Sequence, residues 1–247
     1  MVTLALKILK PSERYLERQA QKSLGLAVLC IVALSILVLI SFPKLPTRID
    51  LGDYEAAFIL AIVFPVAGVL YYSRRYSTYK MGAEGETRVT QVLTSKLSDD
   101  YYLVNDVVYT NDRGHKENID HVVLGPNGVF AIETKNYRGK VSYKNGYWQV
   151  PFPLGRSPSS QAKSNASWVN RAINACRTFE TSKVWVEPIV VFSNPDLELE
   201  VIGAEVEVVT LATLTDLITS YNKGYSFSAE QLILMGEGIL KQARAAL

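Results

Sequence analysis

The feature that most restricts the fold of this 247-residue chain is an apolar run near its N-terminus. Residues 24–42, "LGLAVLCIVALSILVLISF", contain no charged side chain. A helix of about 20 apolar residues matches the hydrocarbon thickness of a bilayer. The run is long for the apolar part of a signal peptide, and the following "SFPKLP" has no small-x-small cleavage pattern. We therefore expect a transmembrane helix rather than a signal peptide or a buried helix of a soluble fold.

A second uncharged run, residues 56–72, follows closely and contains Pro65. It is at the short end for a span, but a membrane helix tolerates a proline. Basic residues precede the first run and follow the second, whereas the short connection has few of them. Because cytoplasmic loops are enriched in Lys and Arg, we predict a two-helix hairpin over residues 23–73 in the cell (inner) membrane, with both termini cytoplasmic. Residues 1–22 would form a cytoplasmic amphipathic segment at the membrane surface.

The remainder, residues 81–247, alternates helical and extended patterns and predicts a mixed α/β domain. The helical pattern "GETRVTQVLTSKL" is followed by the strand pattern "YYLVNDVVY", a first hairpin over 118–135, and a second hairpin in which Asn145-Gly146 favours a two-residue turn. A helix to about Phe179, two more strands and two closing helices complete the prediction.

Charge and cysteine usage narrow the function classes for this domain. Basic residues dominate 134–183, where Glu180 is the single acid, and 184–222 contains acids but no base. A basic stretch could contact the phosphodiester backbone of a nucleic acid, or it could be an ordinary solvated face, and the charges alone leave both readings open. Cys30 and Cys176 provide no disulfide framework and, with two histidines, no zinc-ligand spacing.

The first hairpin, within "NIDHVVLGPNGVFAIETKN", interrupts two apolar strands with charged residues that strands disfavour. Asp120 lies five residues before Gly125, and Glu133 lies five residues after Gly128. Across a tight turn these two positions come abreast, and strand alternation places Glu133 and Lys135 on one face. We therefore expect two carboxylates and one ammonium within a few ångströms of one another.

Such a charge cluster needs compensation, because close carboxylates repel each other and an unpaired buried charge is costly. Lys135 could provide it alone, as a structural ion cluster. A divalent cation would do so better, since Mg²⁺ is held by one or two carboxylates and keeps waters and substrate phosphates as further ligands. A third acid points the same way: Glu86 heads the apolar helical stripe of Val89, Leu93 and Leu97. An interaction with the helix dipole is the alternative reading of Glu86.

A second helical stripe begins at Gln161, after the loop "PFPLGRSPSS", and continues through Asn165, Trp168 and Ala172. From the first turn of that helix, Gln161 would either reach the charged cluster or hydrogen-bond a loop carbonyl.

These residues together resemble a known family. "GAEGE" at a helix start, followed by "NIDHVVLGPNGVFAIETKNYRGKV", resembles the nuclease-related domain (NERD) family, which is similar in turn to the PD-(D/E)xK nuclease superfamily. The resemblance runs from about residue 82 to 194, with Ile119 where the superfamily motif has proline. It implies a restriction-endonuclease-like central mixed β-sheet flanked by helices, Mg²⁺ dependence with Mn²⁺ as a substitute, and phosphodiester hydrolysis.

The resemblance also implies roles for individual residues. Glu86 resembles the helix-borne acid, Asp120 the central metal-binding aspartate, Glu133 and Lys135 the Glu-x-Lys pair, and Gln161 the glutamine often found on the next helix. Asp120 and Glu133, with Glu86 directly or through water, would then bind the metal. Lys135 would position or help to deprotonate the attacking water.

Three functions fit the sequence. The first is a membrane-anchored, Mg²⁺-dependent nuclease acting on DNA, with the bilayer and DNA as partners. The second is a catalytically inactive nucleic-acid-binding or scaffold domain at the membrane. The third is a membrane assembly factor in which the charged cluster is a structural ion network. The intact set of three acids and one lysine favours the first.

Overall fold

The structure is a computed structural model, and it describes residues 7–8, 15–41, 55–111, 114–175 and 184–245. The chain divides into two compact units, one formed by residues 15–83 and the other by residues 1–14 and 84–247. The elements in chain order are β1 (Lys7–Ile8), α1 (Tyr15–Ser41), α2 (Glu55–Lys96), β2 (Tyr102–Thr110), β3 (Lys116–Gly125), β4 (Gly128–Lys135), β5 (Gly139–Lys144), β6 (Tyr147–Gln149), α3 (Pro158–Asn174), β7 (Val186–Phe192), β8 (Leu197–Val201), β9 (Glu207–Thr210), α4 (Leu214–Ser220) and α5 (Ala229–Ala245).

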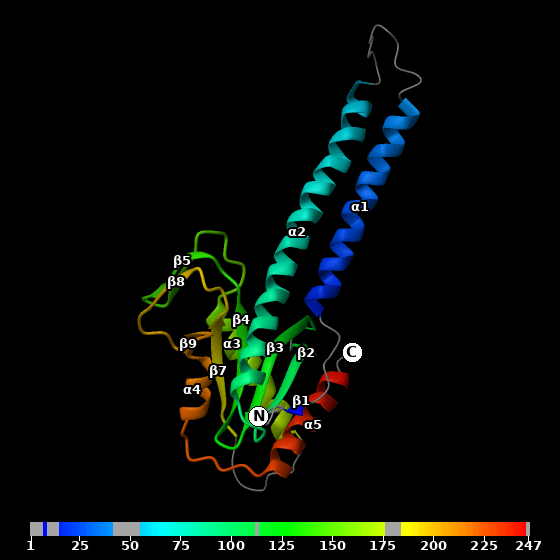
Figure 1. Cartoon of the computed structure of the whole chain (residues 1–247). Helices are drawn as coiled ribbons and strands as arrows, with labels where there is room; N and C mark the ends of the chain where they lie inside the picture. Colours follow the sequence, from blue (N-terminus) through cyan, green and yellow to red (C-terminus); the bar gives the residue numbers. More distant parts are fainter. Residues whose placement is uncertain (1–6, 9–14, 42–54, 112–113, 176–183, 246–247) are drawn as a thin grey trace. The chain divides into compact units, whose positions relative to one another are not determined.

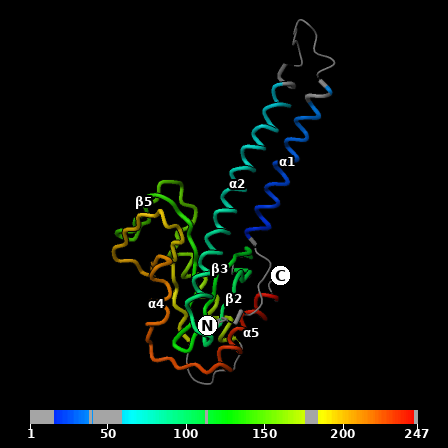
Figure 2. The backbone as a smooth tube through the Cα atoms, viewed as in Figure 1, coloured from blue at the N-terminus to red at the C-terminus, as the bar shows by residue number. Residues whose placement is uncertain are grey.

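The smaller unit consists of α1 and the first part of α2, which lie side by side (Figure 2). A Cβ added to Gly68 would lie 2.7 Å from Cys30 Sγ, and one added to Gly82 would lie 2.7 Å from Leu16 Cδ1, so the two helices approach closely at both glycines. One helix in the described residues is long and apolar enough to cross a membrane, at Leu16–Leu37 in α1, with a mean hydropathy of 1.9. Its length and composition fit a membrane span or a signal sequence.

The predicted pair of membrane spans is therefore corrected to one candidate span within the described residues. The second apolar run covers residues 56–72, and its side chains are described only from Ile59 onward. From there, helix α2 reaches the charged residues Arg74 and Arg75 before its apolar stretch is long enough to cross a membrane. Helix α2 continues without interruption to Lys96, so the second run and the first helix of the domain belong to one helix.

The larger unit is built on a six-stranded sheet with the order β1-β2-β3-β4-β7-β9 (Figure 1). Strands β2, β3 and β4 are antiparallel, whereas β7 and β9 are parallel to β4. Strand β1 extends the edge by pairing Lys7 with Tyr102. Within the segment predicted for residues 1–22, residues 7–8 join the sheet and Tyr15 begins α1, and residues 1–6 and 9–14 lie outside the described part of the chain. The predicted central mixed sheet is confirmed.

Helices cover both faces of this sheet, as predicted. Helices α3 and α5 pack on one face, and the end of α2 and α4 pack on the other. The predicted stripe of Val89, Leu93 and Leu97 is fully buried against the sheet. Burying each such side chain contributes roughly 1.5–3 kcal/mol, which holds the end of α2, and the acid at the head of the stripe, against the sheet.

A smaller sheet with the order β6-β5-β8 lies beside the main one. Its β5-β6 hairpin turns at Asn145 and Gly146, which both have positive φ, of 52° and 86°. Positive φ at both central residues defines the type I′ turn, so the predicted two-residue turn is confirmed. Helix α3 is shorter than predicted: it ends at Asn174 rather than near Phe179, and residues 176–183 lie outside the described part.

Candidate active site

Asp120 and Glu133 meet where strands β3 and β4 separate. The pairing of these strands runs back from the turn and ends at His121↔Ile132. The next position brings Asp120 opposite Glu133, which is the alignment expected from the sequence. Backbone pairing is replaced there by a side-chain contact, in which the Thr134 N–H donates to Asp120 Oδ2 at 2.7 Å. Asp120 and Glu133 are both buried, with exposures of 9% and 5%.

Glu133 is held from two sides. Lys135 Nζ lies 2.6 Å from Glu133 Oε1 in an ion pair whose side chains are 15% and 7% exposed. Asn165 Nδ2, from the buried face of α3, donates to Glu133 Oε2 at 2.9 Å. Burial alone would lower the pKa of Lys135, but attraction to Glu133 and Asp120 raises it above its usual value. The Lys135 amine is therefore a cation in this arrangement.

Glu86 reaches the same place from α2, and Gly85 makes this approach possible. A Cβ at residue 85 would lie 2.7 Å from Ser193 Oγ and 2.9 Å from Asn136 Cβ. Arg88 adds hydrogen bonds from Nη1 to Asn136 Oδ1 and to the Ser193 carbonyl, each 3.3 Å long. The glycine before Glu86 in "GAEGE" therefore serves close packing of α2 on the ends of β4 and β7.

The carboxyl groups of the cluster raise one another's pKa by charge repulsion. Burial, and then the charges of Asp120, Asp106 and Glu133, raise the pKa of Glu86 to about 10, and Glu86 also shares a hydrogen bond with Asp120. Burial and the charge of Glu133 raise the pKa of Asp120 well above its usual value, although Lys135 and the Thr134 N–H act in the opposite direction. The cluster thus needs protons or a cation in addition to Lys135.

Asp106 is a fourth acid of this cluster and was not predicted from the sequence. The pairing of β2 with β3 includes Asn105↔His121 and Val107↔Ile119, so Asp106 comes opposite Asp120. It is 7% exposed, and its φ of 52° is a left-handed conformation that Asp tolerates better than most residues. Its signal was available in "YLVNDVVYT", where an acid interrupts an apolar strand, as Asp120 does in the next one.

The donor set fits a hard divalent cation by its chemistry, because carboxylate oxygens are the ligands that Mg²⁺ and Mn²⁺ prefer. The side chains are not arranged as a preformed metal site: in the described residues, no group of three or more His, Cys, Asp or Glu side chains is placed to hold a metal ion. The reason is visible in the contacts, since both oxygens of Glu133 and one of Asp120 already accept hydrogen bonds. A cation would have to replace some of these donors.

Gln161, the fifth predicted site residue, is half-buried in the first turn of α3, and its side chain makes no hydrogen bond within the described part of the chain. Asn165, one turn later, makes the contact with the cluster instead. Its Oδ1 lies 3.2 Å from the Tyr109 hydroxyl, which is 3.0 Å from Glu117 Oε2. Arg156 pairs with that same Glu117 oxygen at 2.7 Å, so polar contacts lead from the cluster to the loop before α3.

The basic stretch is partly neutralised inside the molecule. Lys144 pairs with Glu200 at 2.7 Å, and Lys163 pairs with Glu205. The acids come from the segment that contains acids and no base, so the two charge blocks face each other in space. For these two lysines the structure favours a solvated face over a nucleic-acid contact.

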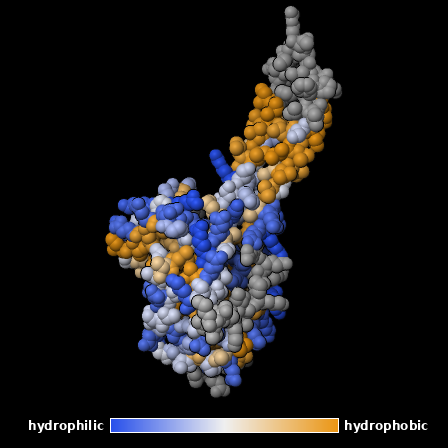
Figure 3. Space-filling model, in the orientation of Figure 1, coloured by the Kyte–Doolittle hydropathy of each residue, from blue (hydrophilic) through white to orange (hydrophobic). Residues whose placement is uncertain are grey.

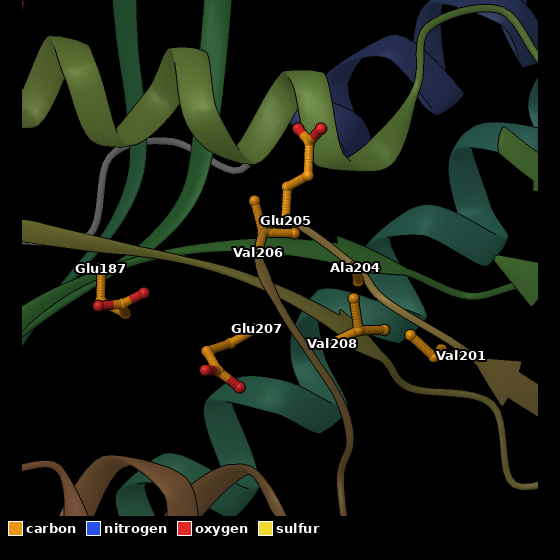
Figure 4. Close-up of a pocket in the computed structure, with 7 residues that line it drawn as sticks. All are labelled: Glu187, Val201, Ala204, Glu205, Val206, Glu207 and Val208. Carbon is orange, nitrogen blue, oxygen red and sulfur yellow. The ribbon is translucent and has the colours of Figure 1, made fainter. Parts of the chain in front are cut away.

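A cavity of about 400 Å³ lies elsewhere, at one edge of the main sheet (Figure 4). It is lined by Glu187 of β7 and by residues of β8, β9 and their connection, namely Val201, Ala204, Glu205, Val206, Glu207 and Val208. None of the predicted site residues lines it. The carboxyl cluster is therefore a separate place from this cavity.

Residues 81–193, just under half of the chain, match the family model of the nuclease-related domain (NERD). An uncharacterized protein of Bacillus anthracis is 30% identical over 92 residues, which are 36% of this chain and 42% of that protein. The probable kinase PglW of Streptomyces coelicolor is 31% identical over 75 residues, 30% of this chain and 5% of that protein. The similarity thus spans less than half of either relative. No solved structure matches the chain.

Proposed function

We propose that this chain, whose residues 81–193 form a nuclease-related domain, is a membrane-anchored, Mg²⁺-dependent nuclease that hydrolyses phosphodiester bonds of DNA. One observation carries the proposal: Glu86, Asp120, Glu133 and Lys135 come together from a helix and two strands at one point of the sheet. With Asp106, four carboxyl groups beside one buried ammonium form a costly arrangement, and a nuclease centre gives a reason for it.

Asp120 and Glu133, with Glu86 directly or through a water molecule, would hold one Mg²⁺ or Mn²⁺ ion. When bound, such an ion polarises a scissile phosphate and lowers the pKa of a coordinated water. The excess of carboxyl groups over Lys135 supports this assignment, because a cation relieves the repulsion that raises the pKa of Glu86 and Asp120.

Lys135 acts through its positive charge. Because its pKa is raised, it is a poor proton acceptor, and stabilisation of developing negative charge is the role that its chemistry supports. In the hydrolysis, water adds to phosphorus, the ester P–O bond breaks, and the departing oxygen takes a proton. The ammonium, held beside the carboxyl cluster by Glu133, would face the phosphate oxygens on which negative charge grows. Gln161, in the first turn of α3, would contribute to the same active site.

Anchoring would be provided by α1, whose Leu16–Leu37 segment has the length and hydropathy of a membrane span. We place the nuclease-related domain and residues 7–8, which pair with its strand β2, on the same, cytoplasmic side of the inner membrane. A reporter enzyme that works only in the cytoplasm, fused to the C-terminus, should be active. A reporter active only outside the cytoplasm would overturn this topology.

The decisive experiment incubates the full chain with supercoiled, linear and single-stranded DNA, in Mg²⁺ and in EDTA. Cleavage is expected in Mg²⁺ alone. Lys135→Met should reduce it by about 10²–10³-fold, while Lys241→Met, at an exposed position of α5, should leave it unchanged. Unchanged metal-dependent cleavage by Lys135→Met would refute the catalytic assignment.

The same assay separates the second candidate function. If the wild-type chain binds the DNA but cleaves none of the three substrates in Mg²⁺ or Mn²⁺, the domain is a nucleic-acid-binding module. This second function is supported by the observation that the described residues contain no preformed group of three or more metal ligands. Calorimetric titration with Mn²⁺ then tells whether the carboxyl cluster binds a cation at all.

A further inference from the structure

The smaller unit exposes an apolar surface that is unusual for a protein in water. Many large apolar side chains of α1 and α2 are about half exposed or more, as illustrated by Leu29 at 62% and Phe64 at 70%. Hydrophobic residues cover both helices in this region (Figure 3). Exposed apolar patches larger than a few hundred Å² mark protein or membrane contacts.

A group of tyrosine and arginine side chains follows this apolar surface on α2. Arg75 Nη1 donates to the Tyr71 hydroxyl at 2.9 Å, and Arg75 Nη2 donates to the Tyr79 hydroxyl. The guanidinium carbon lies 5.6 Å and 5.4 Å from the centres of the two rings. We call Tyr71, Arg75 and Tyr79 the Tyr–Arg clamp. Since Tyr71 and Arg75 are exposed, the clamp presents an oriented cation to its surroundings.

Further exposed bases lie at the same level of the helix pair. Arg74 and Lys80 flank the clamp on α2, and Lys22 is exposed on α1. The close approaches at Gly68 and Gly82 bracket this part of α2 and place it beside the beginning of α1, which contains Lys22. Residues 71–83 contain no acid. We call Lys22, Arg74, Arg75 and Lys80 the basic collar.

We propose that the Tyr–Arg clamp and the basic collar bind the phosphate headgroups of acidic phospholipids. The guanidinium is a fork of five N–H donors that matches phosphate oxygens, and the tyrosines use only part of this capacity. Tyrosine is enriched where protein crosses the headgroup region. The clamp also lies where the exposed apolar surface ends, which is where headgroups would be if α1 is embedded in a bilayer. This inference rests on the proposed membrane anchor and is independent of nuclease chemistry.

The continuity with an apolar surface favours lipid over nucleic acid as the partner. A DNA backbone offers phosphates but no hydrocarbon to cover the side chains next to the collar. An acidic bilayer offers both, and each Lys or Arg near such a surface strengthens binding by about fivefold at physiological salt.

The test uses the full chain in neutral detergent with EDTA, incubated with equal amounts of phosphatidylglycerol and phosphatidylcholine. The lipids that remain bound are quantified by mass spectrometry. Phosphatidylglycerol should be retained preferentially, and the preference should fall by about fivefold in Arg75→Gln and further in the Arg74→Gln, Arg75→Gln double variant. Raising the salt concentration should reduce it. Arg75→Lys keeps the positive charge but loses the forked N–H donors. Its preference for phosphatidylglycerol should lie between that of the wild type and that of Arg75→Gln.

Lys241→Gln, outside the collar, is the matched control and should bind lipid as the wild type does. Equal retention of the two lipids by the wild type, or an unchanged preference in the double variant, would overturn the proposal. So would collar variants that lose retention of a DNA oligonucleotide while keeping the lipid preference. Flotation with vesicles of pure phosphatidylcholine tests the anchor separately: a chain that floats without preferring acidic lipid refutes only the collar, whereas one that does not float refutes the anchor.

Discussion

Replacing Glu86 with glutamine tests the carboxyl cluster through stability rather than through activity. Burial and the neighbouring acids, Asp120 first, raise the pKa of Glu86 from 4.5 to about 10. A carboxyl group whose pKa is raised by folding binds its proton more tightly in the folded state. Its contribution to stability is therefore complete below pH 4.5 and is lost progressively as the pH rises toward 10.

The size of the effect follows from this interval. Between pH 4.5 and pH 7, at about 1.4 kcal/mol per pH unit, the loss of stability amounts to roughly 3.5 kcal/mol. Because Glu86 is only partly buried, solvent screening reduces this to about 2 kcal/mol. Glutamine keeps the shape and does not titrate. Without metal at pH 7, Glu86→Gln should therefore be about 2 kcal/mol more stable than the wild type, and the difference should vanish toward pH 4.5.

Thermal unfolding followed by tryptophan fluorescence measures this difference in the full chain, in neutral detergent with EDTA. Trp148, Trp168 and Trp185 all lie in the larger unit, so the signal reports on the domain that contains the cluster. The expected gain is about 4–8 °C at pH 7. Glu84→Gln, two residues earlier and exposed, is the matched control and should leave the midpoint unchanged.

Adding Mg²⁺ should raise the midpoint of the wild type more than that of Glu86→Gln, because a ligand stabilises the state that binds it. The destabilising effect of ionised Glu86 would be refuted by a variant that melts at or below the wild-type temperature at pH 7 without metal. A difference between the two proteins that did not change with pH would refute it as well.

Two further substitutions test how the site is held. Gly85→Ala places a Cβ 2.7 Å from a serine hydroxyl oxygen and should cost about 1–3 kcal/mol and reduce DNA cleavage, whereas Gly155→Ala, with open space around it, should change neither midpoint nor rate. Equal effects of the two glycine variants would contradict the close-packing argument. Asn165→Ala removes a donor from buried Glu133 and should cost about 1–3 kcal/mol and weaken Mn²⁺ binding by about 10-fold in calorimetry. Asn174→Ala, exposed at the end of the same helix, is its control, and unaltered Mn²⁺ affinity in Asn165→Ala would show that Asn165 does not position Glu133.

The alignment of Asp120 with Glu133 was predictable because it depends on local rules alone. A two-residue turn sets the register of a hairpin, and side chains alternate along each strand. The same holds for Val89, Leu93 and Leu97, whose spacing places them on one side of a helix and which the structure buries. Patterns with a fixed period can be predicted from a short segment because they do not depend on contacts with the rest of the chain.

Asp106 was missed although its local signal was as strong as that of Asp120. Its relation to the cluster depends on the pairing of β2 with β3, across a connection that includes "NDRGHKEN" and does not specify register. Within the described residues, one candidate membrane span is present rather than the predicted two, for a related reason. Each uncharged run taken alone suggests a span, whereas Pro65 and the run around it belong to a continuous helix that turns polar at Arg74.

Sequence alone therefore determined the class of the domain, its apolar N-terminal helix, and the two acids and one lysine of the hairpin, because each of these follows from periodicity within a short segment. Only the tertiary structure decided that Asn165 rather than Gln161 contacts Glu133, and that Lys144 and Lys163 are paired with distant acids. Those contacts join elements that are far apart in the chain. They depend on how a helix lies on a sheet and how two sheets meet, and side-chain packing in three dimensions sets that geometry.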